Sequence, residues 1–211
     1  MPFFDGAAGR IHYRSWNTDA TSVGVVFAHG IRQHTGNYHR FAAGLGARGI
    51  ALWGIDLAGH GLSEGEPDAP GSVESHAADL SALTAIAEDA GVPLVLMGHS
   101  LGAASALALL RTDTDRFGAA VLCGTPRSAT RPEFARALAE SRLPVLAVHG
   151  IDDRLAPVEP VRAWAAEVPN LQLDEYPDAG HDLLHEPVHR AVTRDIAEFV
   201  LEVTARRRPL P

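Results

Sequence analysis

The sequence predicts an α/β fold in which a mostly parallel central sheet is covered by helices on both faces. Apolar runs of strand length alternate with amphipathic runs of helix length along nearly the whole chain. The chain has 211 residues, of which 46% are hydrophobic, so it is long enough to bury a full core. It shows no internal repeat, low-complexity stretch or linker. We therefore expect residues 1–211 to form a single domain.

The expected strands are short apolar runs, and they lie at residues 11–16, 23–29, 50–55, 92–97, 118–123, 143–149 and 171–176. The expected helices carry apolar residues at helical spacing, and they lie at residues 38–48, 73–90, 101–111, 132–141, 158–167 and 188–205. Gly49 ends the first helix, and Ser72 is a suitable N-cap for the second. Glycine and proline mark residues 56–71 as a loop.

The net charge and the cysteine content indicate which binding partners and which cellular compartment to expect for this protein. The net charge of −8 argues against nucleic acid and anionic membrane surfaces as main partners. The single cysteine, Cys123, lies in an apolar run and is expected to be a buried core residue without a disulfide. Residues 1–10 lack the apolar segment of a secretory signal, and no run reaches the ~20 apolar residues of a membrane span. We therefore expect a cytoplasmic protein with no stable membrane insertion.

The most informative motif is Gly-His-Ser-Leu-Gly at residues 98–102, between the expected strand 92–97 and an alanine- and leucine-rich helix. Gly-x-Ser-x-Gly in this context is typical of a nucleophile elbow, a sharp turn that exposes the serine. Gly98 and Gly102 have no Cβ, so strand and helix can approach closely. Ser100 is therefore a candidate nucleophile, because a serine hydroxyl reacts only when it is held beside a base.

Two later loops supply the partners that a hydrolytic serine needs, a base and a group that orients it. Asp152 and Asp153 follow the expected strand 143–149, and His181 follows the strand 171–176. The segment His29–Gly30–Ile31 follows another strand. Because functional groups in an open α/β sheet gather at the carboxyl ends of the strands, we expect these loops to meet beside Ser100. The Ile31 and Leu101 N–H groups are then candidate donors to an oxyanion.

Five segments together resemble the α/β-hydrolases of the monoacylglycerol lipase and lysophospholipase type, the serine aminopeptidase S33-like branch. They occur in the order of that family and include His29-Gly30 with His34 and Tyr38, residues 56–63, 98–102, 149–153, and Gly180-His181. The resemblance implies an α/β-hydrolase fold. It implies Ser100 as nucleophile, His181 as base and Asp153 as the triad acid. It also implies an oxyanion hole formed by the Ile31 and Leu101 N–H groups, and no cofactor.

The chain departs from the family at two places. Residues 124–142, where relatives insert a lid, hold one expected helix, so we predict a reduced or absent cap. Gln33 stands where lipase members carry a glutamate.

Several residues allow a second interpretation. Asp152 is an alternative to Asp153 as the acid, because the residues alone do not separate two neighbouring aspartates. His34 and His99 are expected either to shape loops or to contact substrate, and Phe134 on helix 132–141 is a further candidate for substrate contact. No metal site is expected, since the histidines lack a matching cluster at ligand spacing.

These observations predict a serine hydrolase that cleaves monoacylglycerol-like or small acyl esters through an acyl-enzyme. A thioesterase or another acyl-transfer enzyme on the same triad is the first alternative. A non-catalytic binding module of the same fold is the second, although binding alone does not need the triad residues. The oligomeric state is left open.

Overall fold

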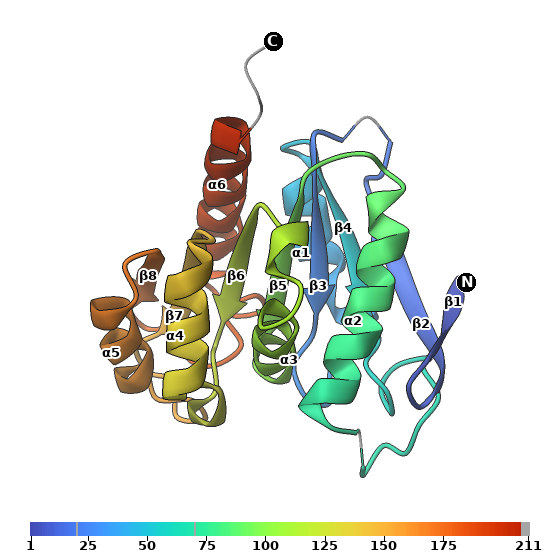
Figure 1. Cartoon of the computed structure of the whole chain (residues 1–211), viewed down its shortest axis with the longest axis horizontal. Helices are drawn as coiled ribbons and strands as arrows, with labels where there is room; N and C mark the ends of the chain where they lie inside the picture. Colours follow the sequence, from blue (N-terminus) through green and yellow to red (C-terminus); the bar gives the residue numbers. More distant parts are fainter. Residues whose placement is uncertain (20, 70, 208–211) are drawn as a thin grey trace.

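The computed structural model describes residues 1–19, 21–69 and 71–207, and its centre is an eight-stranded sheet (Figure 1). The strands run in the order β1-β2-β4-β3-β5-β6-β7-β8. The first two strands pair antiparallel with their neighbours, and all others are parallel. The strands are β1 (Phe3–Gly6), β2 (Gly9–Trp16), β3 (Val23–Ala28), β4 (Ile50–Ile55), β5 (Leu94–His99), β6 (Ala119–Cys123), β7 (Val145–Gly150) and β8 (Leu171–Tyr176).

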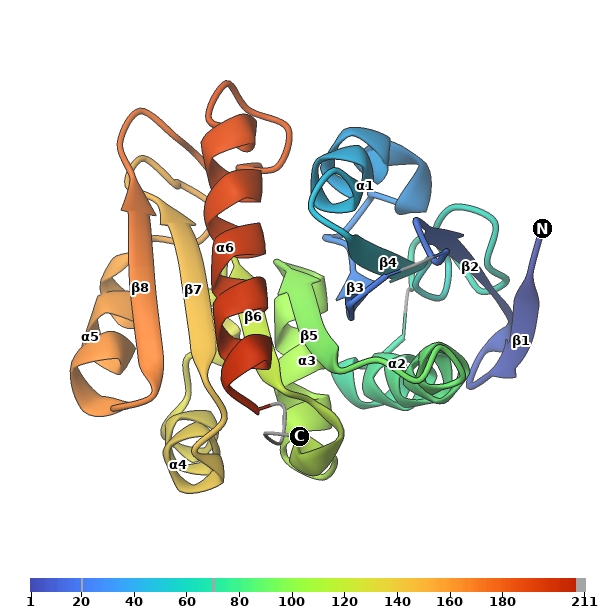
Figure 2. The same cartoon turned by 90° about the horizontal axis from the view of Figure 1, so that it is seen from above.

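Helices cover both faces of this sheet, as Figure 2 shows from above. One face is covered by α2 (Val73–Glu88), α3 (Leu101–Leu110), α4 (Pro132–Ser141) and α5 (Glu159–Glu167), and the other by α1 (His39–Gly46) and α6 (His189–Arg207). Alternate residues of each strand enter the two cores. In β3, Val26 packs with α2 and α3, whereas Val25 and Phe27 pack with α1 and α6. The central strands are therefore apolar throughout.

Most predicted elements are confirmed within one or two residues at each end. Ser72 caps α2, since its hydroxyl accepts a hydrogen bond from the Ser75 N–H at 3.1 Å. The expected helix 38–48 is instead a 3₁₀ turn, η1 (Thr35–Tyr38), followed by α1. The turn begins early because the His34 side chain caps it and Asn37 completes a capping box. The short edge strand β1 was not predicted.

The order of the strands places a crevice at the carboxyl ends of β3 and β5. From β3 the chain passes through α1 to β4 on one side, and from β4 through α2 to β5 on the other side of β3. The loop after β3 leads to α1 on one face of the sheet, and the turn after β5 leads to α3 on the other face. Open α/β sheets bind ligands in the crevice between two such diverging loops. Ile31 lies in the loop after β3, and Ser100 lies in the turn after β5.

The segment predicted as a reduced cap, residues 124–142, contains a 3₁₀ turn, η3 (Arg127–Ala129), and α4. Phe134 and Leu138 of α4 lie in the hydrophobic core with Leu107 of α3. The helix therefore covers the sheet as its neighbours do. No helix in the described ranges is both long and apolar enough to cross a bilayer.

Candidate active site

Ser100 sits in a strained turn between β5 and α3. Its backbone has φ 53° and ψ −112°, a conformation that non-glycine residues rarely adopt. A Cβ on Gly98 would lie 2.1 Å from the Gly102 carbonyl oxygen, and one on Gly102 would lie 2.1 Å from the Ala28 carbonyl oxygen. Only glycine fits either position. Backbone strain of this kind persists only where surrounding structure holds it, and it is characteristic of functional sites.

Ser100, His181 and Asp153 form one chain of hydrogen bonds. The His181 Nε2 and Ser100 Oγ atoms are 2.8 Å apart, and His181 Nδ1 lies 2.6 Å from Asp153 Oδ2. The three residues come from the loops after β5, β8 and β7. With the carboxylate accepting from Nδ1–H, the free lone pair of Nε2 faces the hydroxyl. A base in this tautomer can take the serine proton.

Asp153, rather than its neighbour Asp152, faces the histidine. Asp152 is exposed, whereas Asp153 is only 4% exposed. Burial opposes ionisation of Asp153, but hydrogen bonds from His149, His181 and the Ala156 N–H outweigh it and hold its pKa well below the usual range. The carboxylate is therefore a fixed negative charge beside His181.

Two backbone N–H groups beside Ser100 have no acceptor within the described part of the chain, those of Ile31 and Leu101. Leu101 is the first residue of α3, where helix geometry leaves the N–H unpaired. Ile31 lines the same cavity as Ser100. The side-chain oxygen of Gln33 accepts the Gly30 N–H at 3.1 Å, which fixes the loop that carries Ile31. Both free donors are thus available to an anionic oxygen at the serine.

The cavity at Ser100 has a volume of about 420 Å³. It is lined by Gly30, Ile31, Gln33, His99, Ser100, Pro126, Leu155, Ala156, His181 and Asp182. Its rim is apolar and exposed to solvent, since Ile31 is 56% exposed and Leu155 is 80% exposed. The cavity therefore has a polar floor and an open hydrophobic edge.

Of the three residues expected to contact substrate, only His99 lines this cavity. Phe134 does not, because its side chain is 5% exposed and packs into the core beneath α4, with Arg111 and Arg131 over its ring. His34 does not either, because its Nδ1 caps η1 by accepting the Gly36 N–H. The prediction that Phe134 contacts substrate is corrected accordingly, and His34 agrees with the alternative expectation that it shapes a loop.

A polar network behind His181 was not anticipated from the sequence. Asp182 accepts hydrogen bonds from the Gln33 amide at 3.1 Å and from His185 Nδ1 at 2.7 Å. His99 donates from Nε2 to the His181 carbonyl oxygen at 2.9 Å. Burial lowers the pKa of His99 to about 4, so it is neutral in this network. The network joins the Ile31 loop to the His181 loop, across about 150 residues of sequence.

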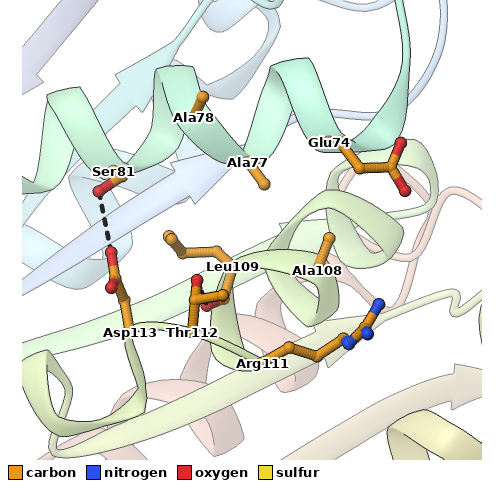
Figure 3. A pocket seen from close by; sticks show the side chains of 9 residues that line it. All are labelled: Glu74, Ala77, Ala78, Ser81, Ala108, Leu109, Arg111, Thr112 and Asp113. Carbon is orange, nitrogen blue, oxygen red and sulfur yellow. Dashed lines mark hydrogen bonds between the residues drawn. The ribbon is translucent and has the colours of Figure 1, made fainter.

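Another cavity, of about 490 Å³, lies between α2 and α3 (Figure 3). Its walls include Ala77, Leu109 and Arg111, and Ser81 donates to Asp113 at its end. None of the described residues that line it is a histidine that could act as the base for a hydroxyl, in contrast to the Ser100 cavity. Within the described ranges, no group of three or more His, Cys, Asp or Glu side chains could hold a metal ion.

Known proteins with similar sequences include lipases of monoacylglycerols. A monoacylglycerol lipase of Mycolicibacterium smegmatis is 26% identical over 267 aligned positions, covering 94% of this chain and 95% of the relative. Since this chain has 211 residues, at least 56 of those positions have no counterpart in it. The human monoglyceride lipase is 30% identical over 64% of this chain, and the match spans 46% of that protein.

Solved structures with the same fold include the Est1E protein of Butyrivibrio proteoclasticus with bound ferulic acid, with a TM-score of 0.84 and 20% identity over 97% of this chain and all of that one. The monoacylglycerol lipase of Paleococcus ferrophilus superimposes with a TM-score of 0.77 and 19% identity over 92% and 99% of the two chains. The model of the family described as serine aminopeptidase, S33, matches residues 20–140. This chain therefore belongs to the S33 serine aminopeptidase family of α/β-hydrolases, in the monoacylglycerol lipase-like branch.

Proposed function

We propose that this protein is a serine carboxylic-ester hydrolase that works through an acyl-enzyme intermediate. The observation that carries the proposal is the hydrogen-bonded chain from Asp153 through His181 to Ser100, with distances of 2.6 Å and 2.8 Å. A hydroxyl, a base and an orienting carboxylate in this order are what nucleophilic acyl transfer requires.

In the first half of the reaction, Ser100 Oγ attacks the ester carbonyl carbon while its proton passes to His181 Nε2. The carbonyl oxygen becomes an anion, which accepts hydrogen bonds from the Ile31 and Leu101 N–H groups. Collapse of this intermediate breaks the bond to the alcohol oxygen, and His181 returns the proton to that oxygen. The alcohol leaves, and the acyl group remains on Ser100.

In the second half, water attacks the acyl carbon and gives a proton to His181. The carboxylic acid leaves, and Ser100 recovers its proton. Asp153 stays ionised throughout, because its hydrogen bonds hold its pKa low. Its role is to keep His181 in the tautomer with the lone pair on Nε2 and to stabilise the imidazolium that forms in each half.

The substrate class follows from the relatives and from the shape of the cavity. Relatives that match this chain include monoacylglycerol lipases and a probable esterase, which favours a monoacylglycerol or a related small acyl ester. The exposed apolar side chains of Ile31 and Leu155 lie at the rim of the Ser100 cavity. An acyl chain of moderate length would contact this rim while its carbonyl group reaches Ser100.

The test compares three substrates that share one acyl group: a butyryl ester of a simple alcohol, monobutyrylglycerol and a butyryl thioester. We expect hydrolysis of both oxygen esters, and a loss of about 10⁶-fold in kcat in Ser100→Ala. A thioester turned over far faster than both esters would instead establish a thioesterase. Absence of turnover on all three would indicate a binding module of this fold.

A further inference from the structure

A groove between α1 and α6 is lined by cations. Helices α1 and α6 lie on the face of the sheet opposite α2 and α3 (Figure 2), and the groove between them has a volume of about 450 Å³. Arg40 and Arg48 line it from α1 and the turn after α1, and His189 and Arg190 line it from the start of α6. The groove shares no lining residue with the Ser100 cavity.

The floor of this cationic groove is made of small side chains. A Cβ on Gly44 would lie 2.7 Å from Thr193 Cγ2, so the two helices approach closely there. Ala43 completes the floor. Small residues leave the groove concave, and the three arginine side chains that border it are exposed.

The positive charge of the groove is not balanced by nearby carboxylates. Among the described residues, Arg40, Arg48 and Arg190 form no ion pair, and no groove residue is acidic. In a chain with a net charge of −8, such a cluster is unexpected. The pKa of His189 is lowered, first by slight burial and then by the positive charges of Arg40 and Arg190. This agrees with the two arginines lying close to His189.

Two carboxylates in α6 and in the loop before it, Glu186 and Asp195, have other partners. Glu186 accepts the backbone N–H groups of Gly180 and Asp182. Asp195 pairs with Arg194 and accepts the Tyr176 hydroxyl. Neither carboxylate lines the groove, so no carboxylate among the described residues pairs with its guanidinium groups, and Arg48 Nη1 donates to the Gly44 carbonyl oxygen at 3.4 Å.

We propose that this groove binds a small soluble ligand that carries two phosphate groups. Guanidinium groups bind phosphate through two parallel hydrogen bonds. Arg40 and Arg190 lie near His189, and Arg48 borders the groove from the turn after α1, where its Nη1 donates to the Gly44 carbonyl oxygen at 3.4 Å. A diphosphate offers more anionic oxygens to these three guanidinium groups than a single phosphate does. A concave site also suits a small molecule better than a flat membrane surface.

The test measures binding of inorganic pyrophosphate, ADP and inorganic phosphate to the full chain by calorimetry. We expect Kd values below about 1 mM for ADP or pyrophosphate, and weaker binding of phosphate. The double variant Arg40→Gln/Arg190→Gln should lose at least about tenfold in affinity, or 1.4 kcal/mol. The double variant Arg127→Gln/Arg136→Gln removes the same charge from exposed sites elsewhere and should bind as the wild type does. In addition, nuclear magnetic resonance should show that the ligand raises the pKa of His189.

Binding should persist in Ser100→Ala, so its outcome is independent of the proposed esterase activity. Equal affinity in the Arg40/Arg190 and Arg127/Arg136 variants would show attraction by overall charge alone and overturn the proposal. So would absence of binding by the wild type at millimolar ligand. Arginine-dependent binding to vesicles rich in phosphatidylglycerol, with none to ADP or pyrophosphate, would assign the groove to a lipid surface instead.

Discussion

At the residue scale, the choice between two adjacent aspartates is decided by what each side chain contacts. Asp153 Oδ1 accepts the Leu155 and Ala156 N–H groups at 2.9 Å and 2.8 Å, which leaves Oδ2 for His181. This arrangement fixes the carboxylate before any substrate binds. Asp152 is exposed and its carboxylate forms no comparable bond among the described residues. The two positions therefore differ sharply in what a substitution should do.

Asp153→Asn should lower kcat by about 10⁴-fold, because an amide N–H facing His181 Nδ1 would favour the wrong tautomer. Asp152→Asn is the matched control and should retain activity within a few-fold. Initial rates on one p-nitrophenyl ester, measured beside circular dichroism spectra, provide the comparison. If Asp152→Asn were the more damaging change, the assignment of the acid would be off by one position.

His185 is the residue whose protonation bears on stability near neutral pH. Its hydrogen bond to Asp182 raises its pKa, against burial and the charge of Arg40, while its Nε2 donates to the Asn37 carbonyl oxygen. Because the folded pKa is raised, the stabilisation is fully present below the unfolded value of about 6.5 and is lost as pH rises through the folded value. The pKa of Asp182 is lowered: burial opposes ionisation, but its bonds to His185 and Gln33 outweigh it. The stabilisation from ionised Asp182 is therefore fully present above the unfolded value of about 4 and is lost as pH falls through the lowered folded value.

His185→Gln should consequently cost most stability between about pH 4 and 6.5 and progressively less at higher pH. Free energies of urea unfolding for both proteins across pH 5 to 9 measure this. His39→Gln on α1 serves as the control variant, because His39 is exposed and accepts the Trp16 indole N–H but pairs with no carboxylate among the described residues. A difference between wild type and His185→Gln that stays constant or grows with pH would contradict the assignment of a protonated His185.

At the element scale, the elbow depends on the close contact between β5 and α3. Gly98→Ala would place a Cβ 2.1 Å from the Gly102 carbonyl oxygen, so strand and helix must separate. We expect a loss of about 3 kcal/mol or more in unfolding free energy, at the upper end of overpacking costs, together with loss of activity. Gly118→Ala, where the nearest atom is 3.5 Å away, should be close to neutral. Equal stability of the two variants in urea would refute this account of the elbow.

The same scale shows what sequence patterns predict well and where they fail. The seven predicted strands and the elbow at Ser100 follow from apolar runs and from glycines that the local geometry requires. The edge strand β1, at Phe3–Gly6, is only four residues long and has one neighbour in the sheet, so it leaves little pattern. Phe134 was correctly placed on a helix, but periodicity does not say whether its side chain meets a cavity or the core.

The polar network illustrates a stronger limit on prediction. Gln33 and Asp182 are 149 residues apart, and neither belongs to a spacing motif. Their contact depends on how the loops after β3 and β8 fold over the edge of the sheet. The triad was predictable because its three residues each follow a strand in a known order, whereas the network residues have no such register.

At the scale of the whole molecule, the Ser100 cavity has little roof. Helix α4, within residues 124–142, packs into the core, and the rim residue Leu155 is 80% exposed. A buried methylene contributes about 0.8 kcal/mol, or roughly fourfold in kcat/KM, but only where the protein removes it from water. An open rim removes only the first few methylene groups of an acyl chain from water, so further carbons add no such gain.

We therefore expect kcat/KM to rise over short acyl chains and then to level off or fall at medium length. We also expect no jump in activity when the substrate passes from monomers to an emulsion, because no lid has to open. A p-nitrophenyl ester series and a tributyrin titration across its solubility limit measure both effects. Steadily rising kcat/KM to long chains, or strong activation at the interface, would mean that another element or partner covers the cavity.

The central claim is that Ser100 is the nucleophile, and covalent labelling with a fluorophosphonate tests it most directly. Intact-mass and peptide spectra should show one adduct per chain, located on Ser100, and the adduct should be absent from Ser100→Ala. Ser105→Ala removes a nearby hydroxyl that donates to the Leu101 carbonyl oxygen, and it should be labelled like the wild type. An adduct that persists in Ser100→Ala, or that maps to another residue, would contradict the account.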